Sequence, residues 1–278
     1  MPLTFNMLLR AEGIDPTEVR LLRHQQVSKT GLTPYAIWRD DPAELERYQS
    51  AQPSDRRHYF REKYWAGFVA PPDGSTLFVG LYELFGYAEV APDWIDPLHR
   101  QTSAQIGREL DIYAYSRLPN FDRYSGCLKI EWGDGKRSWN QRAHKQDKSI
   151  VELTRAFKEP DFPGFTSFIC NLGALPNIPA SWIAALSAVR GVYLLTCPRT
   201  HEQYVGSAYG GSGLWGRWQS YLATGHGGNE GLRSRDPSDY QVSVLEVAGS
   251  GATANDVIAM EQKWKAKLQS REMGLNRN

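Results

Sequence analysis

The chain has 278 residues, of which 41% are hydrophobic and 23% charged, and 32 Lys+Arg against 31 Asp+Glu give a formal net charge of +1. This composition excludes a wholly disordered chain, and the near-neutral charge excludes a small, uniformly basic nucleic-acid coat protein. A chain of this length predicts roughly two domains.

Three cysteines, Cys127, Cys170 and Cys197, lie far apart and form no C-x-x-C pair. Their number and spacing support neither a zinc ribbon nor a disulfide framework, and they suit a reducing compartment. The N-terminus lacks the pattern of a signal peptide, and no apolar run approaches the roughly 20 residues of a membrane helix. We therefore expect a cytoplasmic protein with no membrane partner.

The chain opens with two stretches that suggest short helices, residues 4–11 and 16–24, joined by Gly13-Ile14-Asp15. Asp15 would cap the second helix, and Pro16 would lie in its first turn. This pair could read DNA as a helix-turn-helix, or it could simply form a helical lid on the domain behind it.

The next segments alternate β-forming runs with turns, which predicts a β-rich α+β domain over residues 1–175. Pro71-Pro72-Asp73-Gly74 is a turn signal between two such runs, so these should form a hairpin. The expected strands are residues 64–69, 76–82 and 126–132, the last followed by a turn at 133–135 and a return strand through Ser138-Trp139.

The stretch 123–148 is the most basic part of this first domain, with seven Lys+Arg against three Asp+Glu (7 − 3 = +4) and interleaved aromatic residues. Cations that alternate with aromatic rings near a turn can track phosphates and stack on bases, although a solvated hairpin with core tryptophans gives the same pattern. The candidate DNA-binding residues are Lys136, Arg137, Arg142, Lys145, Trp132 and Trp139.

Turn-forming residues are dense at 171–179, which suggests a domain boundary there and a second domain over residues 180–278. The pattern then predicts a hairpin of strands 191–197 and 204–209, a glycine-rich loop, a helix from Leu214, a strand at 240–247 and a helix at about 256–270 capped by Asn255 or Thr253. This is the order of a small antiparallel sheet flanked by helices.

The loop spells G-x-G-x-x-G at Gly211, Gly213 and Gly216. A dinucleotide site also needs a parallel βαβ unit, whereas the preceding strand is expected to pair in a hairpin. The loop is better explained as the turn that brings the helix back over the hairpin, with Trp215 and Trp218 in the core.

Glu261 interrupts an apolar stripe on the last helix formed by Val257, Trp264 and Leu268. An unpaired carboxylate on a buried face costs several kcal/mol or changes its pKa. Glu261 is therefore ion-paired with Arg217 or another cation, or lies at the edge of the stripe and reaches water, or is a metal ligand or catalytic carboxylate.

Gly191-Val192-Tyr193 followed by Tyr204-Val205-Gly206 resembles the signature of the GIY-YIG nuclease family. Arg217 on the following helix, Glu261 on the last helix and Asn276 near the end of the chain are similar in order and context to further family residues. The resemblance covers residues 191–278, about 88 residues. It implies a GIY-YIG nuclease fold for the C-terminal domain.

The resemblance implies phosphodiester hydrolysis with Mg²⁺ (or Mn²⁺) bound by Glu261, because Mg²⁺ takes few protein ligands and keeps several waters. Arg217 would contact the phosphate and stabilise its transition state, and Tyr193 or Tyr204 would position or deprotonate water, Tyr193 being the better base candidate. Ser207 stands where some relatives carry lysine, so Lys263 or Lys265 could supply that role. The candidate catalytic residues are Tyr193, Tyr204, Arg217, Tyr221, Glu261, Asn276 and His226.

We therefore expect a Mg²⁺-dependent endonuclease of restriction or defence that acts on double-stranded DNA, with the first domain selecting the target. That domain is only faintly similar to PUA/EVE-like modified-base readers, so modified DNA is one candidate target. A repair or recombination nuclease is an alternative, and so is a non-catalytic nucleic-acid-binding protein on the same fold. One active site per chain implies a homodimer or sequential nicking.

Overall fold

The computed structural model describes residues 2–133, 138–228, 232 and 240–277, in which the chain divides into two compact units. Unit 1 comprises residues 1–28 and 32–159, and unit 2 comprises residues 29–31 and 160–278. Both units combine helices with a sheet, so the α+β class expected from the sequence is confirmed. No described helix combines the length and apolarity needed to cross a bilayer.

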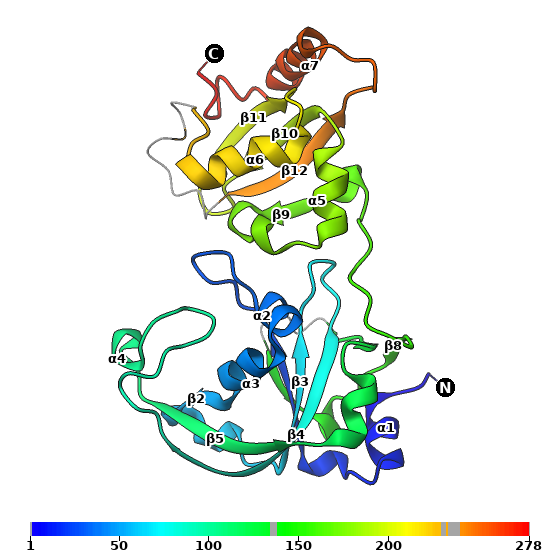
Figure 1. The fold of residues 1–278 in the computed structure, drawn as a ribbon, viewed down its shortest axis with the longest axis vertical. Coiled ribbons are helices and arrows are strands. Elements are labelled where there is room, and N and C mark those ends of the chain that lie inside the picture. Colours follow the sequence, from blue (N-terminus) through cyan, green and yellow to red (C-terminus); the bar gives the residue numbers. More distant parts are fainter. Residues whose placement is uncertain (1, 134–137, 229–231, 233–239, 278) are drawn as a thin grey trace. The chain divides into compact units, whose positions relative to one another are not determined.

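Unit 1 is built on a sheet of eight described strands in the order β2-β5-β4-β3-β1-β7 (Figure 1), in which β6 pairs with β4 and β8 pairs with β6. All pairs are antiparallel except β1 with β3. The strands are β1 Val19–His24, β2 Ala51–Pro53, β3 Tyr64–Val69, β4 Leu77–Glu89, β5 Leu110–Arg117, β6 Leu128–Ile130, β7 Asn140–Arg142 and β8 Ile150–Leu153. Its helices are α1 Phe5–Ala11, α2 Pro34–Asp40, α3 Pro42–Ser50 and α4 Ser103–Ile106, with short 3-10 turns at Pro16–Glu18, Ser54–Tyr59, Pro119–Tyr124 and Ala143–Lys145.

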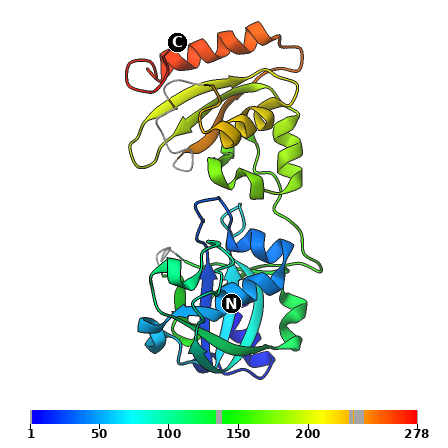
Figure 2. The same ribbon diagram turned by 60° about the vertical axis from the view of Figure 1, so that its left-hand side comes forward.

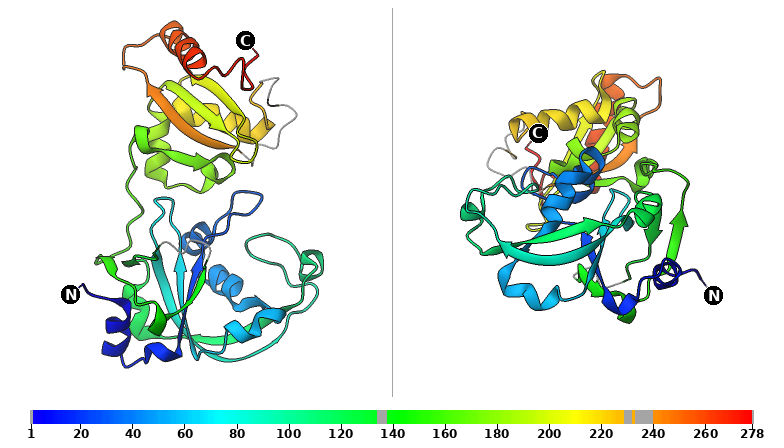
Figure 3. Two further views of the ribbon diagram at one scale, coloured as in Figure 1. Left: turned by 180° about the vertical axis from the view of Figure 1, so that it is seen from behind. Right: turned by 60° about the horizontal axis from the view of Figure 1, so that its bottom comes forward.

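Strands β1 and β3 are buried along their whole length because helices cover both faces of the sheet. Phe5 and Leu9 of α1 pack with Leu21 and Phe68 in one core, while α2 and α3 contribute to a second core with Val69. The segment before α1 bridges to Ser149, beside β8 (Figure 3).

Two sequence-based expectations for unit 1 are wrong. Residues 19–24 form a strand rather than a helix, and only Pro16–Glu18 is a 3-10 turn, capped by Asp15 as expected. A short strand buried on both faces has no period-2 pattern that would distinguish it from a helix. The return strand lies at β7 and pairs with β1, not with the 126–132 run. The expected turn at 133–135 lies mostly outside the described residues. The hairpin of β3 and β4 is confirmed.

Unit 2 has a four-stranded antiparallel sheet in the order β11-β10-β12-β9 (Figure 2). The strands are β9 Ile169–Asn171, β10 Gly191–Thr196, β11 Gln203–Ala208 and β12 Gln241–Val247. The helices are α5 Ala180–Ser187, α6 Gly213–Thr224 and α7 Ala254–Lys267, with 3-10 turns at Phe165–Ser167 and Leu172–Asn177. Leu214 and Trp218 of α6 pack on one face of the sheet with Tyr193, and Thr253 caps α7.

The division between the units falls at Glu159/Pro160 rather than in the turn-rich segment 171–179. That segment belongs to unit 2, because β9 pairs with β12 and the following 3-10 turn buries Leu172 and Leu175 in its core. Its turn-forming residues therefore shape a packed part of unit 2 instead of a linker.

The glycines of the two sequence triplets each make room for a neighbour. Gly206 lies opposite Tyr193 across β10 and β11, and a Cβ at this position would come within 2.4 Å of the Tyr193 hydroxyl oxygen. A Cβ at Gly191 would come within 2.2 Å of the Glu246 carbonyl oxygen on β12. Close cross-strand approach, not left-handed backbone conformation, explains both glycines.

We predict that Gly206→Ala destabilises unit 2 by about 1–3 kcal/mol, because the new methyl group overpacks a core in which Tyr193 is fully buried. Gly249→Ala is the matched control, since a Cβ there meets nothing within 4 Å. Urea denaturation followed by near-ultraviolet circular dichroism measures both. Equal stabilities of the two variants would contradict the packing argument.

Candidate active site

A cavity of about 520 Å³ lies beside β11, an edge strand of the unit 2 sheet. Helices α6 and α7 both contact this strand. At an edge strand, side chains from both faces of a sheet can reach one space, and Arg217 of α6 and Glu261 of α7 line the same cavity. Tyr204 and Ser207 of β11 complete the wall between them.

Arg217 joins two buried tyrosines in a hydrogen-bonded cluster. Its Nε donates to the Tyr193 hydroxyl at 3.2 Å, and its Nη1 donates to the Gly227 carbonyl at 3.1 Å. The Tyr193 and Tyr221 hydroxyls lie 2.7 Å apart, and the guanidinium carbon lies 5.1 Å from the centre of the Tyr221 ring. These contacts hold the guanidinium in one orientation at the cavity wall.

The tyrosines of this site are neutral at physiological pH. Burial raises the pKa of Tyr193, Tyr204 and Tyr221 above the ordinary value of about 10, and the Arg217 charge only partly opposes this. Tyr193 is fully buried, whereas Tyr204 lines the cavity. Of the two tyrosines expected to act on water, Tyr204 is the one that the structure places at the cavity.

Glu261 is buried on the inner face of α7 and has two protein partners. Lys265, one turn later and fully buried, places its Nζ 2.7 Å from Glu261 Oε1, and the Ser207 hydroxyl donates to Oε2. The cation paired with Glu261 is therefore Lys265 rather than Arg217. The spacing of four residues could have indicated this pair from the sequence, since residues i and i+4 are neighbours on a helix.

Asn276 holds the C-terminal segment against β11. Its Oδ1 accepts from Val205 N at 2.9 Å and its Nδ2 donates to Val205 O at 2.8 Å, so one amide satisfies both outward-facing backbone groups of that residue. Asn276 is buried and is not among the residues that line the cavity. Its place in the structure is that of a positioning residue for the strand that carries Tyr204 and Ser207.

His226 and the glycine-rich loop lie at opposite ends of α6. His226 follows the helix, and its Nδ1 accepts from Gly228 N at 2.9 Å, but it does not line the cavity. The loop before the helix does line the cavity. The strand that precedes the loop pairs antiparallel with β10, so the described residues contain no parallel βαβ unit there. Trp218 is a core residue, and Trp215 packs half-buried against the same core.

Of the four candidate DNA-binding residues that the structure describes, Arg142 and Trp132 have protein partners. Arg142 Nε donates to Glu62 at 3.1 Å, and Trp132 is buried with its indole N–H bonded to Ser138 O. Trp132 is therefore a core residue and not a stacking platform. Lys145 is exposed, Trp139 is half-buried, and Lys136 and Arg137 lie outside the described residues.

No protein-family model matches this chain, and no curated protein matches it. Two solved structures are similar to it. The catalytic domain of homing endonuclease I-TevI is 24% identical with a TM-score of 0.27, and the match covers 32% of this chain and 98% of that one. A mutant form of the catalytic domain of intron endonuclease I-TevI is 20% identical with a TM-score of 0.27, covering 32% of this chain and 94% of that one.

We predict that the free energy of unfolding falls as the pH rises above about 10. The unfolded chain then loses tyrosine protons that Tyr193, Tyr204 and Tyr221 retain in the fold, so each buried tyrosine contributes a slope of up to about 1.4 kcal/mol per pH unit. Below this range the three are neutral in both states and contribute no slope. Tyr221→Phe should give a shallower decline in urea denaturation at pH 9 to 11, and an unchanged slope would contradict this account.

Proposed function

We propose that unit 2 is a divalent-metal-dependent nuclease domain that hydrolyses phosphodiester bonds of DNA. The observation that carries the proposal is the convergence of a fixed guanidinium, a neutral tyrosine hydroxyl and a buried carboxylate on one cavity at the edge of β11. A guanidinium suits a phosphate, and a carboxylate suits a hard cation that neutralises developing charge.

The residues present fit a Mg²⁺ or Mn²⁺ ion held by Glu261. Each carboxylate oxygen has more than one acceptor site, so the contacts with Lys265 and Ser207 leave capacity for an ion, and the cavity has room for the waters that Mg²⁺ keeps. When bound, such an ion would neutralise charge on the phosphate and lower the pKa of a coordinated water. The donor set of one carboxylate with hydroxyl neighbours is oxygen-rich and hard, as these cations require.

Arg217 would bind the phosphate group. The guanidinium has five N–H groups. One bonds to Tyr193, one to Gly227, and one lies 3.5 Å from the Tyr221 hydroxyl, so among the described contacts two N–H groups remain for a phosphate oxygen. Because the tyrosines and Gly227 already fix the guanidinium, little side-chain entropy remains to be lost when phosphate binds. Tyr204 would orient the attacking water by hydrogen bonding, since its raised pKa disfavours a free phenolate.

We further propose that the protein acts in restriction or defence, with unit 1 selecting the DNA and modified bases among its targets. Residues 191–278 carry nine Lys+Arg against eight Asp+Glu, so the catalytic domain has little net attraction for DNA. Weak non-specific binding at physiological salt makes cleavage depend on contacts supplied elsewhere in the chain.

Removing the carboxylate should abolish metal-dependent cleavage. Glu261→Ala alone would leave Lys265 buried without its partner, so we choose the double variant Glu261→Gln with Lys265→Met, which removes both charges at similar volume. We expect plasmid cleavage in Mg²⁺ to fall by on the order of 100-fold or more, while Lys267→Met, at an exposed position of the same helix, retains activity. Cleavage that persists in EDTA, or in the double variant, would refute the mechanism.

Target selection is tested by substrate pairs of identical sequence. If modified bases are the target, the full chain should cut phage DNA that carries modified cytosines at least about tenfold faster than the same DNA amplified without modification. Gel assays of linear and nicked products measure both rates. Equal rates on the two substrates would remove modified bases from the proposal and leave the nuclease activity standing.

A further inference from the structure

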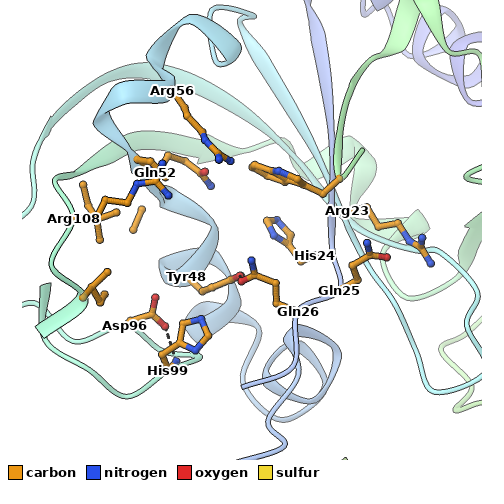
Figure 4. A pocket seen from close by; sticks show the side chains of 15 residues that line it. Arg23, His24, Gln25, Gln26, Tyr48, Gln52, Arg56, Asp96, His99 and Arg108 are labelled. Carbon is orange, nitrogen blue, oxygen red and sulfur yellow. Dashed lines mark hydrogen bonds between the residues drawn. The ribbon is translucent and has the colours of Figure 1, made fainter. Parts of the chain in front are cut away.

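Unit 1 contains its own cavity, of about 560 Å³, well separated in sequence from the residues of the candidate active site (Figure 4). It lies among β1, α3, the segment that begins at β2 and the loop that carries Asp96 and His99. This volume is within the range of about 300–1,000 Å³ typical of small-molecule and cofactor sites. The cavity takes no part in the proposed hydrolysis.

Three aromatic rings form one side of this cavity. His24 lies between Tyr48, at 5.5 Å between ring centres, and Trp139, at 6.2 Å. Burial lowers the pKa of His24 to about 4, and its Nε2 is hydrogen-bonded to Gln49 Oε1 at 3.1 Å, so the ring is neutral and fixed. The ring planes are inclined to one another, by 71° between His24 and Tyr48 and by 40° between His24 and Trp139, so this side offers uncharged aromatic faces and edges against which a planar heterocycle can pack.

Two buried side chains that line the cavity, Asp96 and Gln52, offer hydrogen-bond acceptors. Asp96 is buried, and its Oδ1 accepts from the backbone N–H groups of Leu98 and His99 at 2.7 Å each. Among the described residues nothing donates to Asp96 Oδ2. The buried Gln52 donates its amide N–H to Gln49 O at 2.8 Å, and no described group donates to its carbonyl oxygen. A ligand that completes this edge must supply N–H donors.

Cationic side chains stand at the margin of the same cavity. Arg56 lines it and also lines a neighbouring hollow beside Trp139, and no ion pair of Arg56 is found among the described residues. Arg108 lines the cavity as well, although Asp55 pairs with it at 2.8 Å. A guanidinium that has no ion pair among the described residues, next to aromatic rings, fits a ligand that carries a phosphate beside a planar ring.

We propose that this cavity receives one amino-bearing nucleobase of a DNA strand, adenine, cytosine or guanine, stacked among Trp139, Tyr48 and His24. The exocyclic amino group would donate to Asp96, and Arg56 would contact the adjoining phosphate. Thymine is disfavoured because it has no amino group and places carbonyl oxygens toward the carboxylate. In a duplex the base would have to leave the stack, as in other proteins that read an extruded base. That the ligand belongs to DNA rests on the proposed function of unit 2.

The test uses the full chain in EDTA, so that binding is measured without cleavage. Fluorescence anisotropy compares oligothymidine 12-mers with strands in which one central thymine is replaced by adenine, cytosine or guanine. We expect at least one replacement to tighten binding about tenfold or more. A duplex with that base mispaired should bind more tightly than the matched duplex, because extrusion then costs less. Equal binding of all four strands would overturn the proposal.

Free nucleotides test whether the cavity binds a base within a DNA strand or a free nucleotide, which carries the same base and phosphate. The deoxynucleoside monophosphate of the preferred base should compete with the labelled strand only at concentrations far above the strand's dissociation constant. Competition by the free nucleotide at the strand's own concentration would show a nucleotide-binding site and would overturn the assignment to DNA.

Asp96→Asn tests the carboxylate itself. Asparagine keeps an Oδ1 that can accept from Leu98 and His99, but it replaces the second acceptor with a donor. We expect the preference for the amino-bearing base to disappear, while Asp93→Asn, at an exposed position three residues earlier, retains it. A preference that survives Asp96→Asn would overturn the proposal.

Arg56→Gln provides a second test that does not depend on the loop around Asp96. The variant should weaken the binding of all four strands equally, and it should reduce the slope of log Kd against log salt by the amount expected for about one phosphate contact. Arg61→Gln, at an exposed site away from the cavity, should change neither quantity. An unchanged salt dependence in Arg56→Gln would overturn the phosphate contact.

The outcomes of the two proposals are distinguishable. Selective binding without cleavage in Mg²⁺ would refute only the nuclease proposal, and cleavage with unselective binding would refute only the proposal of a base-binding cavity.

Discussion

The ion pair between Glu261 and Lys265 is the interaction on which the geometry of unit 2 depends. A carboxylate on the inner face of α7 would be expensive to bury alone, and removing one partner of such a pair typically costs about 3–5 kcal/mol. Lys265 and the Ser207 hydroxyl together satisfy it. The Lys265 contact is made within α7, whereas the Ser207 contact exists only if α7 lies on β11 in one register. The same contacts place the Glu261 carboxylate at the wall of the cavity beside β11. One arrangement therefore both satisfies the buried carboxylate and exposes it to the cavity.

The edge position of β11 is the second constraint. An edge strand presents unpaired N–H and C=O groups that could pair with another chain. Here the Asn276 amide takes the place of a neighbouring strand at Val205, and Leu275 N bonds to Gln203 O beside it. The C-terminal segment therefore closes the backbone of β11, while its side chains still reach the cavity. This explains physically why an asparagine near the end of the chain belongs with residues about 70 positions earlier.

The sequence predicted unit 2 well because its signals are local. Strands β10 and β11 follow β-branched and aromatic runs, and α7 begins at a Thr253 capping box. The expected stripe on α7 is only partly confirmed, because Val257 and Glu261 are buried together with Lys265, whereas Trp264 and Leu268 are half-buried. Unit 1 is different, since β1 pairs in parallel with β3, which is about 45 positions away in the register, and with β7 about 120 positions away. The cavity beside His24 draws on four distant segments, and no spacing rule brings Tyr48, Asp96 and Trp139 together. Such long-range pairing is decided by burial on both faces of a sheet, which a single sequence does not display.

Many of the cations in the basic stretch of unit 1 are paired with other groups of the same unit. In the basic stretch 123–148, Arg123 pairs with Glu12, Lys129 with Glu152 and Arg142 with Glu62, and Lys148 is buried under Trp132. The carboxylates beside Arg123, Lys129 and Arg142 offset the charge of these cations and so reduce the attraction of this stretch for phosphates at long range. The proposed affinity for DNA would then come from a few cations that lack such partners and from short-range contacts inside a cavity. Such contacts depend on the identity of the base, whereas a diffuse basic surface binds any sequence. If unit 2 has the proposed nuclease activity, its selectivity would depend on unit 1, because neither unit would bind DNA strongly by charge alone.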